Sequence, residues 1–580
     1  MGTISDKLMR IINTKEDIRR ALISKGYDVP TSIPFKEYAK MILDLPCNAD
    51  SFPDIEGIVA RYSALGLTNE QMAENPVWKD LTGNGHDLQM KNFAWKGMSG
   101  VGGYTENYDS NRWYKVASRI DTTWTYKSFN VKSIKDNNSA QLFYQSLSSD
   151  TGFRVLSCTI KVSGLTDGQG IEYVSNGTQQ FVIMRIENDG IYHLPSFDFG
   201  AKNAYYGFRF LKLQESCNIT IEQLPLYPGA LVFDGVDDYG TCNNFPILTK
   251  EKGYTVVALR QWLSFQDIGY PTLVVNSTDR LAAFSFEDFR NKTKSTWNWG
   301  KSVGLSDYKI PLLYTYQTST SYNSKTISAG ATEEGSNILQ VCRSGFYCAN
   351  AAIWEIVILD HDATEEELTK IKDYFVKTYP WLFPDQAWTV VGKTNEDEDR
   401  ATIANITGNG NDLVLSNFGF AEGSGYNEEG EYAGYLVTDG VDDKVVSKQF
   451  KFGENFTVIL DFKFPVKKIS YCGFDLSAKV RIQNLQDSGV YVVLKGNKTL
   501  IPSNVVRAVT SEGKVYDENW NEYNIVPGNI SSNYTMVNLG FDGSIQFAES
   551  ATKLAGIYSS TLSKDECIKA YNYLQTLKSK

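Results

Sequence analysis

Histidine is scarce in this chain, with only three in 580 residues. Ser-His-Asp and Cys-His catalysis therefore have few candidate bases, and none of His86, His193 and His361 lies in a nucleophile-elbow motif. The eight cysteines are scattered, and no second pair near Cys342 and Cys348 completes a zinc site. We interpret the cysteines as reduced core residues, because the dense disulfide framework of a small secreted domain is absent.

Long apolar runs and an excess of positive charge are also missing. No window approaches 18 consecutive apolar residues, and the first 20 residues hold no signal-peptide core, so we expect synthesis in the cytoplasm and no membrane insertion. The net charge is -11 at pH 7. Because binding to nucleic acid needs a clustered basic face, we predict no nucleic-acid partner.

The sequence also lacks the motifs of two further classes of catalytic or ligand-binding site. The GNG segments are not followed by Lys-Ser or Lys-Thr, so they do not form a phosphate-binding loop. A glycosidase needs two carboxylates about 5 to 9 Å apart across a cleft. The E-x-D-x-x-E strand signature that some sandwich-fold glycosidases carry does not occur in this sequence. We therefore expect no enzymatic activity.

The chain does contain many aromatic residues, 34 Tyr and 30 Phe. Beyond Asp54, short apolar runs alternate with Gly, Asn, Asp and Ser turns, which is typical of antiparallel β-sandwiches. The first 50 residues differ, with helical patterns over 5–12, 14–25 and 34–45. These helices are too small to form a core alone, so we predict a module for attachment or oligomerisation.

Three sequence segments occur twice. LTGNGHDLQMKNFAW starts at residue 81 and matches ITGNGNDLVLSNFGF at residue 406, which is 325 residues later. DGVDD at 234 recurs at 439, only 205 residues later, and ATEEELTKIKDYF at 363 matches LSKDECIKAYNYL at 562, 199 residues later. The first copy therefore holds about 120 extra residues between Trp95 and Asp234, which we interpret as an inserted domain.

These repeats predict four parts. They are a helical module over 1–50, a first sandwich over 51–102 plus 226–383, an inserted sandwich over 103–225, and a second sandwich over 384–580. Each parent copy is expected to close with a strand and a helix that begins with a capping box, at Thr364 and Glu367 and at Ser563 and Glu566. The roughly eight strand-like runs of the insert suit a jelly roll.

The DGVDD segments are candidate calcium sites, because carboxylate oxygens in a loop are what Ca²⁺ requires. The alternative, which we favour, is that the first aspartate of each segment caps the local backbone and the others shape a turn. No cofactor other than this calcium is expected. The candidate ligands are Asp234, Asp237, Asp238, Asp439, Asp442 and Asp443.

Sugar binding uses aromatic faces together with a few directional polar groups. The insert offers Trp113, Trp124, Tyr126 and Tyr205 in stretches rich in Asn, Asp and Ser, so we predict these four residues as the glycan-binding site. For each of them the competing interpretation is a place in the sandwich core.

Two resemblances cover nearly the whole chain. The order of a GNG-x-D-L segment, a DGVDD turn and a final strand with a T/S-x-x-E helix resembles the concanavalin A-like (laminin G-like) lectin sandwich. The segment TKEDIRRALISKGYDVPTSIPFKEYAKMI, residues 14–42, resembles a module at the start of virion appendage proteins of tailed phages, especially crAss-like gut phages. The lectin pattern occurs at residues 83–88, 234–238 and 353–375, and again at 408–413, 439–443 and 554–574.

These resemblances imply a phage virion fibre, on tail or head, that is made in the host cytoplasm and exposed on the particle. Residues 1–50 would bind other virion proteins and form a homotrimer, and the sandwiches would contact cell-surface or mucus glycans. The alternatives are a purely structural decoration protein, a tailspike-type glycan depolymerase, and a bacterial surface adhesin.

Overall fold

The computed structural model describes most of the chain after residue 51. Described are Lys15, Arg19, 52–577 and 579, except for 117–119, 134–136, 146–153, 177–179, 199–204, 249–252, 265–271, 276–284, 291–294, 299–300, 305–311, 318, 323–324, 329–335, 422, 429–431, 465–471, 478, 485–488, 504, 531–533, 541–546 and 578. Apart from Lys15 and Arg19, the helices predicted over 1–50 lie outside the described residues, as does Cys47.

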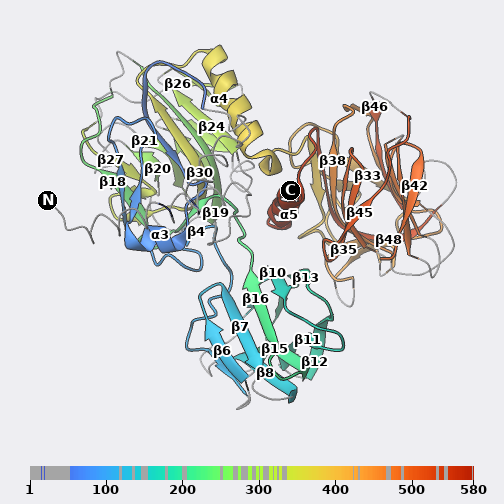
Figure 1. Cartoon of the computed structure of the whole chain (residues 1–580). Coiled ribbons are helices and arrows are strands. Elements are labelled where there is room, and N and C mark those ends of the chain that lie inside the picture. Colours follow the sequence, from blue (N-terminus) through green and yellow to red (C-terminus); the bar gives the residue numbers. More distant parts are fainter. Residues whose placement is uncertain are drawn as a thin grey trace.

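The predicted mostly β fold is confirmed: in the described part of the chain antiparallel sheets predominate, and helices are few. Figure 1 shows three β-rich bodies, with the insert below the other two and helix α5 (Lys564–Gln575) at the centre. The seven described cysteines are buried and form no disulfide bonds, as expected. No helix in the described part of the chain is long and apolar enough to cross a membrane.

The first sandwich is built from two facing sheets. One has the order β24–β19–β30–β17–β4 with β1 also paired to β30, and the other runs β2–β3–β18–β27–β20–β21–β22–β23. Their bounds are β24 (Leu312–Gln317), β19 (Thr255–Ser264), β30 (Asn350–Leu359), β17 (Leu231–Asp234), β4 (Gly100–Val101) and β1 (Ile58–Ser63), then β2 (Val77–Trp78), β3 (Leu88–Lys91), β18 (Tyr239–Cys242), β27 (Leu339–Val341), β20 (Thr272–Val275), β21 (Ser285–Arg290), β22 (Ser295–Asn298) and β23 (Lys301–Gly304).

The second sandwich repeats this strand order. Its sheets run β43–β38–β48–β35–β34, extended by β44 and β45 and with β31 paired to β48, and β32–β33–β36–β47–β39–β40–β41–β42. Their bounds are β43 (Val505–Thr510), β38 (Thr457–Lys463), β48 (Glu549–Tyr558), β35 (Tyr435–Asp439), β34 (Gly425–Asn427), β44 (Lys514–Asp517), β45 (Glu522–Asn524) and β31 (Gln386–Thr389), then β32 (Thr402–Ile403), β33 (Leu413–Ser416), β36 (Lys444–Ser447), β47 (Val537–Leu539), β39 (Cys472–Leu476), β40 (Val480–Asn484), β41 (Val490–Leu494) and β42 (Asn497–Ile501).

Burial along the strands follows their place in each sheet. The central strands β30 and β48 are buried along almost their whole length, whereas β3 and β33 alternate between buried and exposed residues because one face of their sheet meets water. Helices α4 (Glu365–Thr378) and α5 follow the central strands, and both begin with the capping boxes predicted at Thr364 and Ser563. Helix α3 (Asn69–Glu74) follows β1.

The inserted sandwich has two five-stranded sheets of its own, β13–β10–β16–β7–β6 and β12–β11–β15–β8–β5. It occupies a hairpin loop: the chain leaves after β4 and returns before β17, and these strands pair through Val101 with Leu231. The bounds are β13 (Gly190–Leu194), β10 (Cys158–Ser163), β16 (Asn218–Gln223), β7 (Ser128–Ser133), β6 (Ile120–Trp124), β12 (Gln180–Ile186), β11 (Gly170–Asn176), β15 (Tyr205–Leu213), β8 (Asn137–Gln145) and β5 (Trp113–Lys115).

Candidate functional sites

The GNG segments form structural loops. Gly83 and Gly85 have φ values of +83° and +82°, which favour glycine. Between them, Asn84 donates from Nδ2 to the carbonyl of Val59 in β1 at 2.9 Å. In the second copy, Asn409 donates to the carbonyl of Asp385 at 2.7 Å. This repeated motif therefore fastens a loop to β1 in the first sandwich and to the residue before β31 in the second.

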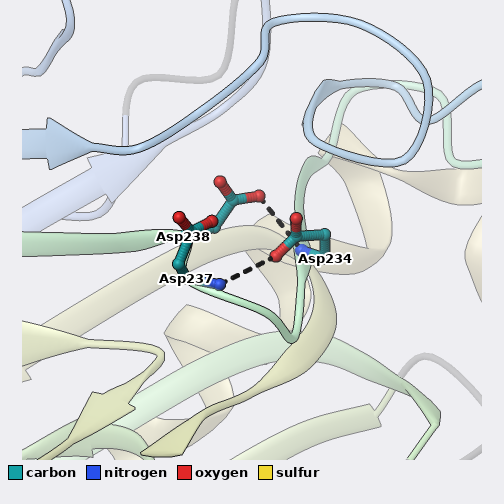
Figure 2. A group of neighbouring side chains, drawn as sticks. All are labelled: Asp234, Asp237 and Asp238. Carbon is teal, nitrogen blue, oxygen red and sulfur yellow. Dashed lines mark hydrogen bonds between the residues drawn. The ribbon is translucent and has the colours of Figure 1, made fainter. Parts of the chain in front are cut away.

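The first DGVDD segment is a tight turn held by its own aspartates. Asp234 Oδ1 accepts hydrogen bonds from the N–H groups of Val236 at 2.7 Å and of Asp237 at 3.4 Å, and Asp238 Oδ2 accepts from Asp234 N–H at 3.1 Å. Figure 2 shows how the three carboxylates gather around this turn. The aspartates thus satisfy backbone donors, as expected of a local cap.

The second turn repeats these bonds. Asp439 Oδ1 accepts from the N–H groups of Val441 at 2.8 Å and Asp442 at 3.3 Å, and Asp443 Oδ2 accepts from Asp439 N–H at 2.8 Å. A neighbouring asparagine supports each turn: Asn417 Nδ2 donates to the Asp442 carbonyl at 3.0 Å. Asn92 does the same for Asp237 at 3.0 Å, which explains why the GNG-to-NF segment and the DGVDD turn recur together.

Each aspartate turn could also offer oxygen ligands to a cation. Within each turn, one carboxylate oxygen from each of the three aspartates lies within 4.8 Å of the others. Ca²⁺ usually takes about six to eight oxygens, so three carboxylates would need further ligands. Burial raises the pKa of Asp238 to about 7 and that of Asp443 to about 6, because the charged form loses hydration there. Calcium binding at either turn stays a prediction.

Trp113 was predicted to stack on a sugar, and the structure places it instead in the core of the insert. Its side chain is only 7% exposed. The indole makes edge contacts with the rings of Tyr108 at 5.0 Å and Tyr206 at 5.7 Å. The prediction for Trp113 is therefore wrong: the residue follows a polar stretch, but at the start of β5 its side chain turns inward.

The other three predicted aromatic residues are half-buried and lie in different places. Trp124, in β6, tilts against Phe129 at 5.4 Å, and Tyr205, in β15 of the other sheet, stacks on Phe143 at 4.4 Å. Tyr126 accepts a 3.0 Å hydrogen bond from Asn69 in α3, so it joins the insert to the first sandwich. The four residues do not form one surface.

Asp461 is a functional candidate that the sequence reasoning missed. It lies in β38 of the second sandwich, is 2% exposed, and forms an ion pair with Arg507 of β43. Its carboxylate also accepts hydrogen bonds from Tyr435 at 2.9 Å, Tyr571 at 3.2 Å and Gln575 at 2.8 Å. The positive charges of Arg507 and Lys553 outweigh the burial and hold the pKa of Asp461 well below its usual range.

The insert docks against this charged cluster. The ring of His193 in β13 meets the ring of Tyr571 edge-on at 6.1 Å, and Gly190 lies close to Asn519 of the second sandwich. Burial, together with the positive charge of Lys553, lowers the pKa of His193 to about 3. In Figure 1, β10 and β13 accordingly lie next to α5.

The contact between the insert and α5 fixes the state of the histidine. Thr159 in β10 donates to Asn572 Oδ1 at 2.9 Å, and the Thr159 oxygen lies 3.2 Å from His193 Nδ1. Since the hydroxyl has one proton and gives it to Asn572, Nδ1 of His193 must carry the hydrogen that Thr159 accepts. His193 is thus a neutral Nδ1–H tautomer at neutral pH.

An apolar cluster beside this junction contains buried residues of the first and second sandwiches, and partly buried residues of the insert pack against it. Trp354 and Trp381 lie in it beside Trp520 and Tyr558, and Ile191 of the insert packs against its edge. The three sandwiches are therefore joined by buried side chains as well as by the chain itself.

Comparisons with known proteins assign neither a family nor a function to this chain. No family model matches the sequence, and no curated protein matches it. Among solved structures, the botulinum neurotoxin serotype D binding domain matches with 11% identity and a TM-score of 0.24, over 32% of this chain and 51% of that chain. A Trypanosoma rangeli sialidase in complex with sialic acid matches with 10% identity and a TM-score of 0.25, over 81% and 86% of the two chains.

This chain spans about half the length of the neurotoxin structures that it matches. At such TM-scores, neither match assigns a ligand or an activity to it.

Proposed function

We propose that this chain is a fibre protein of a tailed-phage virion, on tail or head, that binds glycan without cleaving it. Residues 1–50 would attach it to other virion proteins and form a homotrimer. The sandwiches would then project from the particle and contact host-surface or mucus glycans. The resemblance of residues 14–42 to virion appendage modules supports the attachment role.

The observation that carries this proposal is the joining of three sandwiches through buried contacts. The second sandwich and the insert meet where Thr159 bonds to Asn572 and His193 contacts Tyr571, beside a shared apolar cluster. Such a coupled array suits a protein that must transmit force between a particle and a surface. Trimerisation would multiply weak contacts, because linked sites raise the overall affinity by orders of magnitude.

Immunogold labelling of purified particles tests the virion assignment. An antibody against the full chain should mark appendages of the tail or the head. Particles that infect normally and carry no label would contradict the proposal. Labelled particles whose fibre binds no glycan would favour the purely structural alternative.

A further inference from the structure

The inserted sandwich contains a polar cavity of about 400 Å³ that the predicted aromatic site does not include. This volume lies within the range of about 300–1,000 Å³ that small-molecule sites usually have. The cavity lies between the loop that joins β10 to β11 and the loop that joins β12 to β13. Its lining includes Asp167, Gln169, Glu172, Arg185, Glu187 and Lys212.

The two loops that frame the cavity are pinned to each other. Asp189 of one loop accepts hydrogen bonds from the N–H groups of Gly164 and Leu165 of the other, both at 2.8 Å. The hydroxyl of Tyr192 in β13 donates to the carbonyl of Asn188 at 2.6 Å. The cavity is thus shaped before any ligand arrives, which lowers the entropy cost of binding.

Two of the buried side chains that line the cavity are polar, beside the apolar Ile171 and Ile186. Glu172 is 4% exposed, and its carboxylate lies between Arg185, at 3.0 Å, and Arg209. Gln169 is also 4% exposed, and its Oε1 accepts from Thr166 N–H at 3.0 Å. This bond orients the amide, and its Nε2 has no hydrogen-bond partner among the described residues. Both side chains are therefore held in place at the cavity by contacts within the insert.

The rim carries exposed groups of both signs. Asp167 and Glu187 are acceptors, whereas Arg185 and Lys212 are donors, and all four are exposed. The lining has no aromatic ring on which a nucleobase or a sugar ring could stack, so a ligand here would be held by polar groups alone. Rim charges of both signs do not suit a phosphate, and among the described residues only the two aspartate turns group three possible metal ligands.

We infer that this cavity binds one neutral sugar residue of a glycan. A sugar hydroxyl both donates and accepts, so neighbouring hydroxyls match a rim that offers carboxylates beside a guanidinium and an ammonium group. An acidic sugar fits less well, because the lining carries three carboxylates, Asp167, Glu172 and Glu187, against the two cations Arg185 and Lys212. This inference rests on the proposed glycan binding and locates the glycan-binding site in the insert.

Saturation-transfer NMR on the full chain tests the inference. The probes are the methyl glycosides of D-glucose, D-galactose and D-mannose, with D-glucuronate as the acidic probe. At least one neutral probe should bind, and the exposed-site variants Asp167→Asn and Arg185→Ala should each weaken it about three- to tenfold, the usual effect of one hydrogen bond. Lys132→Ala is the matched control: it removes an exposed cation from β7, outside the cavity, and should change nothing.

Retention of the same full chain on host-surface polysaccharide separates the inference from the proposed function. If the chain is retained but both cavity variants bind the probes as tightly as the original, the cavity is not the site. Binding of D-glucuronate alone would overturn the choice of a neutral sugar. If the chain binds neither polysaccharide nor probe, the inference and the proposed function both fail.

Discussion

The hydroxyl of Thr159 in the inserted sandwich donates a 2.9 Å hydrogen bond to the side-chain oxygen of Asn572 in helix α5. The two residues are 413 positions apart in the sequence. Around this bond, His193 lies against Tyr571, whose hydroxyl reaches Asp461. The insert is therefore not only a loop of the first sandwich, because it also completes a buried junction with the second.

Breaking the charge pair of this junction should destabilise the second sandwich. Asp461→Asn leaves Arg507 beside a neutral group, and removal of one partner of a buried pair costs about 3 to 5 kcal/mol. Urea unfolding followed by Trp fluorescence measures this loss. The control is Glu366→Gln, which removes an exposed partner of Lys370 on α4 and should leave stability unchanged. Equal effects of the two changes would contradict the junction described here.

Acid should loosen the same junction through His193. The pKa of His193 is lowered to about 3 in the folded chain, whereas an unfolded histidine titrates near 6.5. The unfolded chain therefore binds the proton first, and stability falls as the pH drops from about 6.5 towards 3. At about 1.4 kcal/mol for each pKa unit, this shift corresponds to a loss of about 3 kcal/mol by pH 4.

His193→Gln isolates this effect, because glutamine still offers a donor to Thr159 but takes up no proton in this range. Thermal melts at pH 7 and pH 4 should show a smaller fall in Tm for the variant than for the original chain. Parallel pH profiles would show that another group is responsible.

The aspartate turns should respond to pH in the opposite direction. The pKa of Asp238 is raised to about 7, so its contribution to stability is lost as the pH rises through that value. Asp238→Asn keeps an acceptor for Asp234 N–H and removes the charge. The difference in Tm between the variant and the original chain should therefore be more in favour of the variant at pH 8.5 than at pH 5. If added calcium raises Tm at pH 8.5 in the original chain alone, the turn is a metal site after all.

Trp113 should behave as a core residue. Trp113→Ala removes a ring that contacts Tyr108 and Tyr206, and such changes cost about 3 to 5 kcal/mol. Trp124→Ala should cost clearly less stability, because Trp124 is half-buried. Calorimetry of the two variants ranks them. An unchanged Tm for Trp113→Ala would contradict the core position of Trp113 and favour a place on the surface.

The repeats made the fold readable from the sequence. The GNG and DGVDD segments and the capping boxes at Thr364 and Ser563 each recur in the same order, which predicts two copies of one sandwich. These motifs can be recognised in the sequence because each of them forms hydrogen bonds with nearby backbone groups. Alternation along the strands accounts for the burial of β3 and β33, whereas β30 and β48 are buried almost continuously.

The site was harder to predict because it depends on contacts between distant segments. Trp113 has polar neighbours in the sequence, which say nothing of the direction of its side chain in β5. Asp461 did leave a signal, since it is the one charge within the apolar stretch TVILDF of β38. That signal indicates a buried ion pair but does not identify its partner. Nothing in the sequence around His193 indicates that this residue contacts the second sandwich.

Retention of the full chain on host-surface polysaccharide, with the reducing ends of the same sample counted, tests the central claim most directly. The account predicts that the chain is retained on the polysaccharide and that the number of reducing ends does not rise with time. A steady release of reducing ends would show a depolymerase, and a chain that is not retained would show a structural component without glycan binding.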